Sequence, residues 1–181
     1  MYSAVSYPEG GISDRASFRK IAGLWPSGVA VITAMDNAGT PFGLTMSSVT
    51  SLSLEPPLYL ICVDLKSTTL PAIQESGRFC INFLMRSQQE VSNIFASKSA
   101  DKFSRVPSRH RPSGHIEIVG SLAVITCTVR DIIAGGDHWI ITGLATEMCG
   151  IDGEPLVHFR GAYREMGPPA NASIHARQSA Q

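Results

Sequence analysis

Short blocks of apolar and β-branched residues alternate with polar turn sequences along most of the chain, a pattern typical of β-strands. The longer blocks span residues 29–35, 58–63, 79–84, 122–129 and 139–144, and shorter ones span 118–119, 132–133 and 156–159. Asp36-Asn37-Ala38-Gly39 follows the first block and predicts a hairpin into a strand that leads to Gly43. Turn sequences at 134–137 and 152–153 separate the last blocks.

Apolar residues at helical spacing predict short helices in three places. The first follows Ser13, which suits an N-cap, and ends before Pro26; the second spans about Leu70 to Ser76. Ser87-Gln88-Gln89-Glu90 matches a capping box, which predicts a third helix. Residues 101–114 are polar and rich in Arg and Pro, so we expect an excursion loop there.

Six or seven strands with two or three short helices, and no strand-helix-strand rhythm, predict a mainly β protein. The expected architecture is an antiparallel barrel with capping helices. With 181 residues the chain is long enough for one domain, which we expect at 13–166. Residues 1–12 and 167–181 carry Pro, Gly, Ser or Asn without apolar periodicity and are expected to be flexible tails.

Composition narrows the function classes. The net charge is formally zero, so no global field favours nucleic acid or an anionic membrane. The sequence has neither a membrane-spanning apolar run nor a signal-peptide pattern near its start, which predicts a soluble cytoplasmic protein. The four cysteines lie far apart without a Cys-x-x-Cys pair, and buried reduced thiols are expected.

Several common catalytic signatures are absent from the sequence. It contains no Gly-x-Gly-x-x-Gly, no phosphate-loop motif, no Gly-x-Ser-x-Gly and no His-Glu-x-x-His. His110 and His115 lie in the Arg-rich segment without acidic or thiol partners in a metal-binding pattern, so no metal site is predicted.

The segment from Gly43 to Pro57 places six Ser or Thr hydroxyls between two strand-like runs. Small polar side chains of this kind suit a flat polar ligand that lies along the backbone. An ordinary strand with its hydroxyls facing water accounts for the same pattern, and spacing alone leaves both interpretations open.

Three further segments could contact a ligand. Lys66-Ser67-Thr68-Thr69 offers a cation, hydroxyls and amides before a helix, which suits a phosphate, although a capped turn fits equally. In Gly135-Gly136-Asp137-His138, Asp137 could orient the His138 ring, or the segment could be a plain turn. Arg160-Gly161-Ala162-Tyr163 could place a cation and an aromatic ring beside a ligand, or could simply end a strand.

Together these segments resemble the flavin reductase-like family, the short reductases that supply reduced flavin to two-component monooxygenases. The resemblance covers about Phe18 to Tyr163. Its motifs occur in order and comprise Trp25 to Thr33, Gly43 to Pro57, Lys66 to Thr69, Phe79 to Leu84, Gln88 with Phe95-Ala96, Asp101-Lys102-Phe103, Gly135 to His138 and Gly161-Ala162-Tyr163.

The resemblance implies a split β-barrel, usually a homodimer, that transfers hydride from NADH or NADPH to FMN or FAD. It implies a flavin site at Thr45, Met46, Ser47, Ser48, Val49, Ser51 and Leu52, with the flavin phosphate at Lys66, Ser67, Thr68 and Thr69 and a further contact at Lys98 and Ser99. It assigns the nicotinamide side to His138, the catalytic candidate, and to Arg160, Gly161 and Tyr163.

Some positions depart from the family pattern. Met46 stands where a small residue is common, and Gly143-Leu144-Ala145-Thr146 replaces the more usual Gly followed by a charged residue and valine. Residues 101–114 are unusually rich in Arg, Ser and Pro. A flavin-retaining oxygenase or oxidase, and a flavin-binding module without turnover, are the alternative functions for the same barrel.

Overall fold

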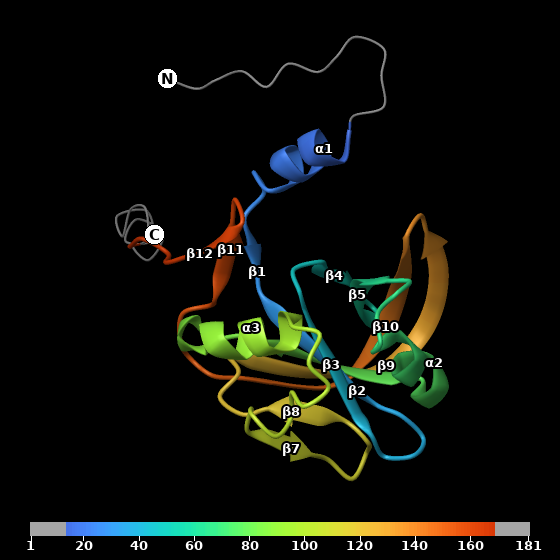
Figure 1. Cartoon of the computed structure of the whole chain (residues 1–181). Helices are drawn as coiled ribbons and strands as arrows, with labels where there is room; N and C mark the ends of the chain where they lie inside the picture. The colour runs from blue at the N-terminus through green and yellow to red at the C-terminus, as the bar shows by residue number, and fades with distance from the viewer. Residues whose placement is uncertain (1–13, 169–181) are drawn as a thin grey trace, which may run out of the picture.

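The computed structural model describes residues 14–168, and its main feature is a strongly curved seven-stranded sheet of order β3-β2-β6-β9-β10-β5-β4 (Figure 1). All neighbouring strands in this sheet are antiparallel. Its strands are β2 (Ala30–Met35), β3 (Pro41–Met46), β4 (Val49–Leu54), β5 (Pro57–Asp64), β6 (Arg78–Phe83), β9 (Ala123–Gly135) and β10 (His138–Gly150). The mainly β, antiparallel prediction is therefore confirmed.

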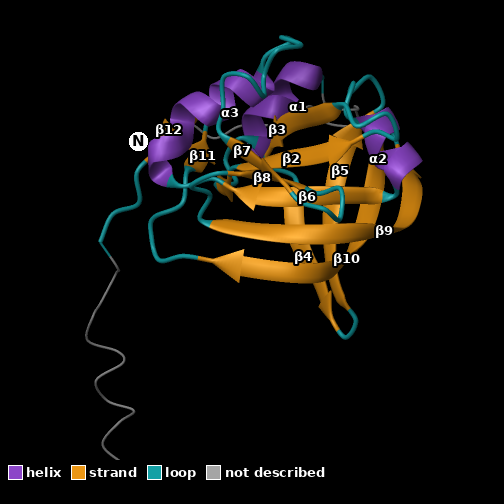
Figure 2. Ribbon diagram, turned by 90° about the horizontal axis from the view of Figure 1, so that it is seen from below, coloured by secondary structure: helices purple, strands orange, loops and turns teal. Residues whose placement is uncertain are grey.

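Two small sheets complete the strands. A three-stranded sheet contains β1 (Ser27–Gly28), β11 (Val157–Phe159) and β12 (Ala162–Arg164), and a two-stranded sheet pairs β7 (Ser108–His110) with β8 (Ile116–Ile118). The described residues contain three α-helices, α1 (Arg15–Ala22), α2 (Leu70–Ser76) and α3 (Gln89–Ala96) (Figure 2). Helices α2 and α3 lie against strands of the main sheet, whereas α1 stands apart from that sheet (Figure 1).

Strand β2 is the centre of the core because its two faces pack into different apolar clusters. Ala30, Ile32 and Ala34 face the barrel interior, together with residues such as Ile61, Phe79, Ile125 and Ile141. Val29, just before β2, and Val31 face the opposite way and pack under α3 and β8, against residues such as Ile94, Phe95 and Ile118. This double burial explains why the block at 29–35 is apolar except for Thr33, whose buried hydroxyl donates to the Ile116 carbonyl.

The helix predictions are confirmed in number but not in all their ends. The helix at 70–76 is found with the predicted bounds. The first helix is capped by Asp14, whose Oδ1 accepts from the amides of Ala16 and Ser17 at 2.8 and 3.0 Å; Ser13 lies outside the described residues. The Ser87 capping box is wrong, because residues 86–88 form a 3₁₀ turn in which the Gln88 side chain accepts from the Met85 amide.

Two other expectations need correction. The segment at 101–114 is not wholly irregular, since residues 108–110 form β7, whose backbone pairs with β8. The predicted break at 134–137 is too wide: β9 and β10 form one long hairpin in which only Gly136 and Asp137 connect the strands. Polar residues such as Arg130 and Asp131 face solvent on this hairpin. These residues interrupt the apolar pattern of the sequence, but the strand continues through them.

The cysteine prediction is only half right. Cys80 and Cys127 are buried, and burial raises the pKa of the Cys127 thiol to about 12. Cys62 is half-buried, and Cys149 is exposed because it lies near the end of β10, beyond the part that pairs with β5. None of the four is in a disulfide.

None of the helices in residues 14–168 is long and apolar enough to cross a membrane.

Candidate functional site

Strand β5 brings three of the predicted ligand segments together. The Ser48 hydroxyl donates to the Cys62 carbonyl at 3.1 Å, and the Cys62 amide donates to the Ser48 carbonyl at 3.2 Å. Two residues further along β5, Asp64 lies directly opposite His138 of β10. Lys66 follows two residues after the end of the strand. The hydroxyl-rich segment, the histidine and the lysine turn are therefore neighbours along one strand, although they are far apart in sequence.

The side chains of the 45–52 segment point in different directions. The Thr45 hydroxyl donates to the Ser92 carbonyl of α3 at 2.7 Å, and the Met46 side chain is buried in the barrel core. Ser47 is exposed, and both Ser47 and Val49 line a cavity. The side chains of Thr45 and Met46 therefore make contacts within the protein, and only the backbone of these two residues can contact a ligand. The packing of Met46 also gives a structural reason for a large residue at this position.

Ser51 and Leu52 lie in β4, an edge strand of the sheet. Ser51 pairs with Tyr59, and the register shifts between Ser51 and Ser53, so Leu52 is the extra residue of a β-bulge. Both side chains are exposed. They are accessible to a ligand or to another protein.

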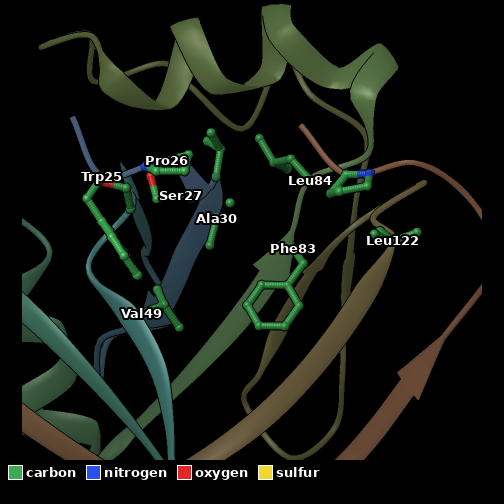
Figure 3. A pocket seen from close by; sticks show the side chains of 12 residues that line it. Trp25, Pro26, Ser27, Ala30, Val49, Phe83, Leu84 and Leu122 are labelled. Carbon is green, nitrogen blue, oxygen red and sulfur yellow. The ribbon is translucent and has the colours of Figure 1, made fainter. Parts of the chain in front are cut away.

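The cavity beside Ser47 has a volume of about 410 Å³ and no charged residue in its lining. Figure 3 shows Trp25 and Pro26 on one side, Phe83, Leu84 and Leu122 on the other, and Val49 below. Its volume lies in the range of small-molecule sites, and its apolar lining with two serines, Ser27 and Ser47, is the composition such sites usually have.

The Lys66–Thr69 turn offers a cation and polar groups at the far end of β5. The Asp64 carboxylate accepts from the Lys66 amide at 2.7 Å, and the Ser67 hydroxyl accepts from the Thr69 amide at 3.3 Å. Lys66 and Thr68 are exposed, whereas Thr69 is only 1% exposed. Helix α2 has seven residues, so its dipole adds little. The turn can present Lys66, Ser67 and Thr68 to an anion, but not the Thr69 side chain.

His138 is held by its neighbour in the hairpin turn. Its Nδ1 lies 2.7 Å from Asp137 Oδ1, and the hydrogen bond and charge of His138 lower the pKa of the Asp137 carboxyl. Since a carboxylate accepts, Nδ1 carries the proton and Nε2 is the nitrogen left for a ligand. The Asp137 carbonyl also accepts from the Leu65 amide at 3.1 Å, which ties the turn to the lysine segment.

Arg160, Gly161 and Tyr163 do not line the cavity. Arg160 and Gly161 form the turn between β11 and β12 with φ values of 52° and 76°, and the Arg160 amide donates to the Gly23 carbonyl at 3.0 Å. The Tyr163 hydroxyl donates to Ser92 Oγ at 2.8 Å. The turn is therefore next to the chain that leads into Trp25, but the Tyr163 hydroxyl is directed at α3.

Lys98 and Ser99 follow α3 and are exposed. Near them, the Lys102 ammonium donates to the carbonyls of Gly43 and Phe95 at 3.0 and 3.1 Å. Burial lowers the pKa of Lys102. Lys102 therefore fixes α3 against β3, a structural contact that the sequence pattern did not predict.

The arginines of the 101–114 segment form ion pairs with glutamates. Arg105 lies 3.7 Å from Glu90, Arg109 lies 3.5 Å from Glu117, and Arg111 pairs with the buried Glu117 and, at 3.4 Å, with Glu147. Their charge is thus balanced within the protein.

His115 is buried and lies 3.3 Å from the Cys127 carbonyl through Nε2, so it belongs to the core and not to a surface site.

A flavin fits the chemistry of this arrangement. An uncharged cavity suits an aromatic ring, small side chains at Ser47 and Ser48 allow the ring's polar edge to approach the backbone, and Lys66 suits a phosphate. The apolar wall of the cavity, which includes Trp25, Phe83, Leu84, Leu122 and Pro155, was not predicted as a ligand site, because apolar residues at a cavity have the same sequence pattern as core residues.

Residues 22–167 match the family model described as the flavin reductase like domain. The chain is 38% identical to the reductase subunit HsaB of a flavin-dependent monooxygenase from Mycobacterium tuberculosis, over 91% of this chain and 89% of that protein. It is 37% identical to the reductase component of a 4-nitrophenol and 4-nitrocatechol monooxygenase from Rhodococcus opacus, over 92% and 89% of the two chains.

Solved structures agree with these relatives. Nitrilotriacetate monooxygenase component B from Mycobacterium thermoresistibile matches with a TM-score of 0.82 and 39% identity, over 87% of this chain and 89% of that one. The NADH:FAD oxidoreductase SgcE6 from Streptomyces globisporus, solved with NAD and FAD fragments, matches with a TM-score of 0.83 and 31% identity, over 87% and 96%.

The fold, the site and these likenesses define the class of protein as a flavin reductase. The chain belongs to the flavin reductase-like domain family, as the resemblance in its sequence indicated.

Proposed function

We propose that this protein is the reductase component of a two-component flavin-dependent monooxygenase, which uses NADH to reduce FAD and releases the reduced flavin to a separate oxygenase. The observation that carries the proposal is the series of contacts that residues of other strands and turns make along β5. Ser48 bonds to Cys62, Asp64 faces His138, and Lys66 follows, so a ring site, a histidine and a phosphate site are arranged in line.

The flavin, when bound, supplies the acceptor for a hydride from the nicotinamide. Such a transfer needs orientation more than acid or base catalysis, which explains a site without a catalytic triad. The backbone of residues 45–49 holds the polar edge of the ring, and Lys66 with Ser67 and Thr68 binds the phosphate. The Asp137–His138 pair keeps the imidazole in one tautomer and orients the nicotinamide through Nε2.

The choice of NADH and FAD rests on likeness to SgcE6, which is named an NADH:FAD oxidoreductase. Initial rates with each nicotinamide against FMN and FAD test this choice. A kcat/KM higher for NADPH or for FMN would overturn it.

The oxygenase partner also rests on the relatives, which are named as reductase subunits of monooxygenases. The cytoplasmic location rests on the sequence, which shows no signal-peptide pattern. A homodimer is supported by the exposed apolar residues of β4 and β10: Leu52 and Leu54 are 49% and 90% exposed, and Met148 is 61% exposed. A second copy that covers β4 would bury them and protect a free sheet edge. Light scattering of the purified protein, with Leu54→Lys as the disrupting variant, tests this.

The role of His138 has a direct test. His138→Ala is expected to raise the nicotinamide KM by about tenfold or to lower kcat. His110→Ala, which alters an exposed histidine on β7, is the matched control and is expected to leave both values unchanged. If both values of His138→Ala equal those of the control, His138 does not contact the nicotinamide.

A further inference from the structure

The cavity beside Ser47 lies between two parts of the fold. Ser27 and Gly28 line it from β1 of the three-stranded sheet, and Ser47 and Val49 line it from the end of β3 and the start of β4 in the main sheet. The distance across the cavity therefore depends on how the small sheet is held against the main one. Strand β1 runs on into β2 of the main sheet, whereas β11 and β12 extend away from it on the other side of β1.

Tyr163 of β12 fastens the small sheet to helix α3. Ser27 lies directly opposite His158 of β11, and His158 lies directly opposite Tyr163, so the three residues form one row across the sheet. The His158 and Tyr163 rings pack edge to face with centroids 5.9 Å apart. At the end of the row, the Tyr163 hydroxyl donates to Ser92 Oγ at 2.8 Å and lies 3.1 Å from Asn93 Oδ1. A residue that lines the cavity is thus connected to α3 through one row of the sheet.

The same residue of α3 also holds the other side of the cavity. The Ser92 carbonyl accepts from the Thr45 hydroxyl at 2.7 Å, and Thr45 lies in β3, two residues before Ser47. In both views of the fold α3 lies between β12 and β3 (Figure 1 and Figure 2). Two hydrogen bonds to Ser92 therefore fix β12 and β3 relative to each other.

The surroundings of Ser92 suit a residue that joins structural elements. Its side chain is fully buried, in the middle of α3. A helix interior favours alanine over serine, and a buried hydroxyl is unfavourable unless it has a hydrogen-bond partner. Tyr163 supplies that partner from outside the helix.

We propose that Ser92 is a positioning residue that sets the width of the flavin cavity, through Tyr163 on one side and Thr45 on the other. Ser92 does not line the cavity, so it acts on the flavin through these two neighbours. The inference rests on the proposed flavin reductase function. It gives Tyr163 a role in placing β1, in place of the nicotinamide contact that the sequence resemblance implied.

Fluorescence titration with riboflavin tests the proposal, because riboflavin lacks the phosphate and reports on the ring site. Ser92→Ala removes Oγ but keeps the carbonyl that Thr45 uses, and Tyr163→Phe removes the hydroxyl but keeps the ring. Each variant is expected to weaken riboflavin binding about two- to fivefold. Since both remove the same hydrogen bond, the double variant should bind riboflavin like the weaker single variant, not with the product of the two losses.

Ser76→Ala is the matched control. It also removes a serine hydroxyl from a helix, one that donates to the Ala72 carbonyl at 2.7 Å, and α2 contributes no residue to the cavity. Its riboflavin affinity should equal that of the native protein. The melting temperature of every variant is measured as well. Tyr163→Phe leaves the buried Ser92 hydroxyl without its partner and should lower the melting temperature more than Ser92→Ala does, although both lose riboflavin affinity alike.

Three results would overturn the proposal. If Ser92→Ala binds riboflavin as tightly as Ser76→Ala, Ser92 serves only the stability of the fold, whatever its melting temperature. If Tyr163→Phe alone raises the nicotinamide KM, Tyr163 contacts the nicotinamide. If the losses multiply in the double variant, the two residues act independently. In each case the native protein still reduces flavin and the proposed function stands, whereas a native protein that binds no riboflavin would overturn both.

Discussion

Gly43 lies where strand β3 packs against Phe95 of helix α3. Its replacement by alanine tests this packing, which lies next to residues 45–52. A Cβ atom at this position would lie 2.6 and 2.8 Å from two ring carbons of Phe95 and 3.2 Å from the Ile32 carbonyl oxygen. The Phe95 ring is 1% exposed and packs edge-on against Phe103 with centroids 5.1 Å apart, so it has little room to move.

Overpacking of this kind destabilises a protein by about 1–3 kcal/mol. Replacing glycine also lowers the conformational entropy of the unfolded chain, which stabilises the folded protein by roughly 0.4–1 kcal/mol. The net expectation for Gly43→Ala is a loss on the order of 1–2 kcal/mol. For a chain of this size that loss lowers the melting temperature by about 2–8 °C.

Urea unfolding followed by circular dichroism measures this change. Gly28→Ala is the control, because nothing lies within 4 Å of its added Cβ. Phe95→Leu removes the clashing ring atoms, so the double variant Gly43→Ala/Phe95→Leu should be more stable than the sum of the single effects predicts, by at least about 0.5 kcal/mol. A Gly43→Ala protein as stable as the Gly28→Ala protein would refute this account of β3 and α3.

Three further predictions follow from the site and the core. Ser47→Leu narrows the cavity and should weaken flavin binding in a fluorescence titration, whereas Thr128→Leu, which alters an exposed side chain of β9 outside the cavity, should not; equal affinities would contradict the cavity assignment. Lys66→Met should weaken FMN binding about two- to tenfold and riboflavin binding much less, since only FMN carries the phosphate, and an equal loss for both would contradict a phosphate contact. Burial lowers the pKa of His115 below its unfolded value of about 6.5, so the unfolded chain binds more protons and stability should fall as the pH drops below about 6.5. His115→Gln should reduce that fall in urea titrations, and an unchanged pH dependence would show that other groups cause it.

The fold class could be predicted from the sequence, because the apolar blocks correspond to strands that are buried on at least one face. The block at 29–35 is apolar except for Thr33 because β2 packs into both clusters. The 70–76 helix is bounded by Pro71 near its start and by Gly77, whose φ of 62° ends it. The long β9–β10 hairpin was underestimated, because its outer half is solvent-exposed and its polar residues carry no apolar periodicity.

Candidate ligand segments were predicted where small or charged residues stand in an unusual order, as at Ser47, Ser48 and Lys66. Sequence order could not tell that Thr45 and Met46 turn into the protein or that Thr69 is buried, because those directions depend on what packs against each face. Trp25 was identifiable as part of a motif, but its place at the mouth of the cavity required the three-dimensional arrangement of β1, β4 and β6.

The central claim is that the protein reduces flavin that it then releases, and anaerobic turnover tests it most directly. A small amount of the protein is mixed with a large excess of NADH and FAD without oxygen, and the absorbance of oxidised flavin is followed. We expect many equivalents of flavin to be bleached per protein chain, in step with NADH oxidation. Bleaching that stops at one equivalent per chain, or no bleaching at all, would contradict the claim.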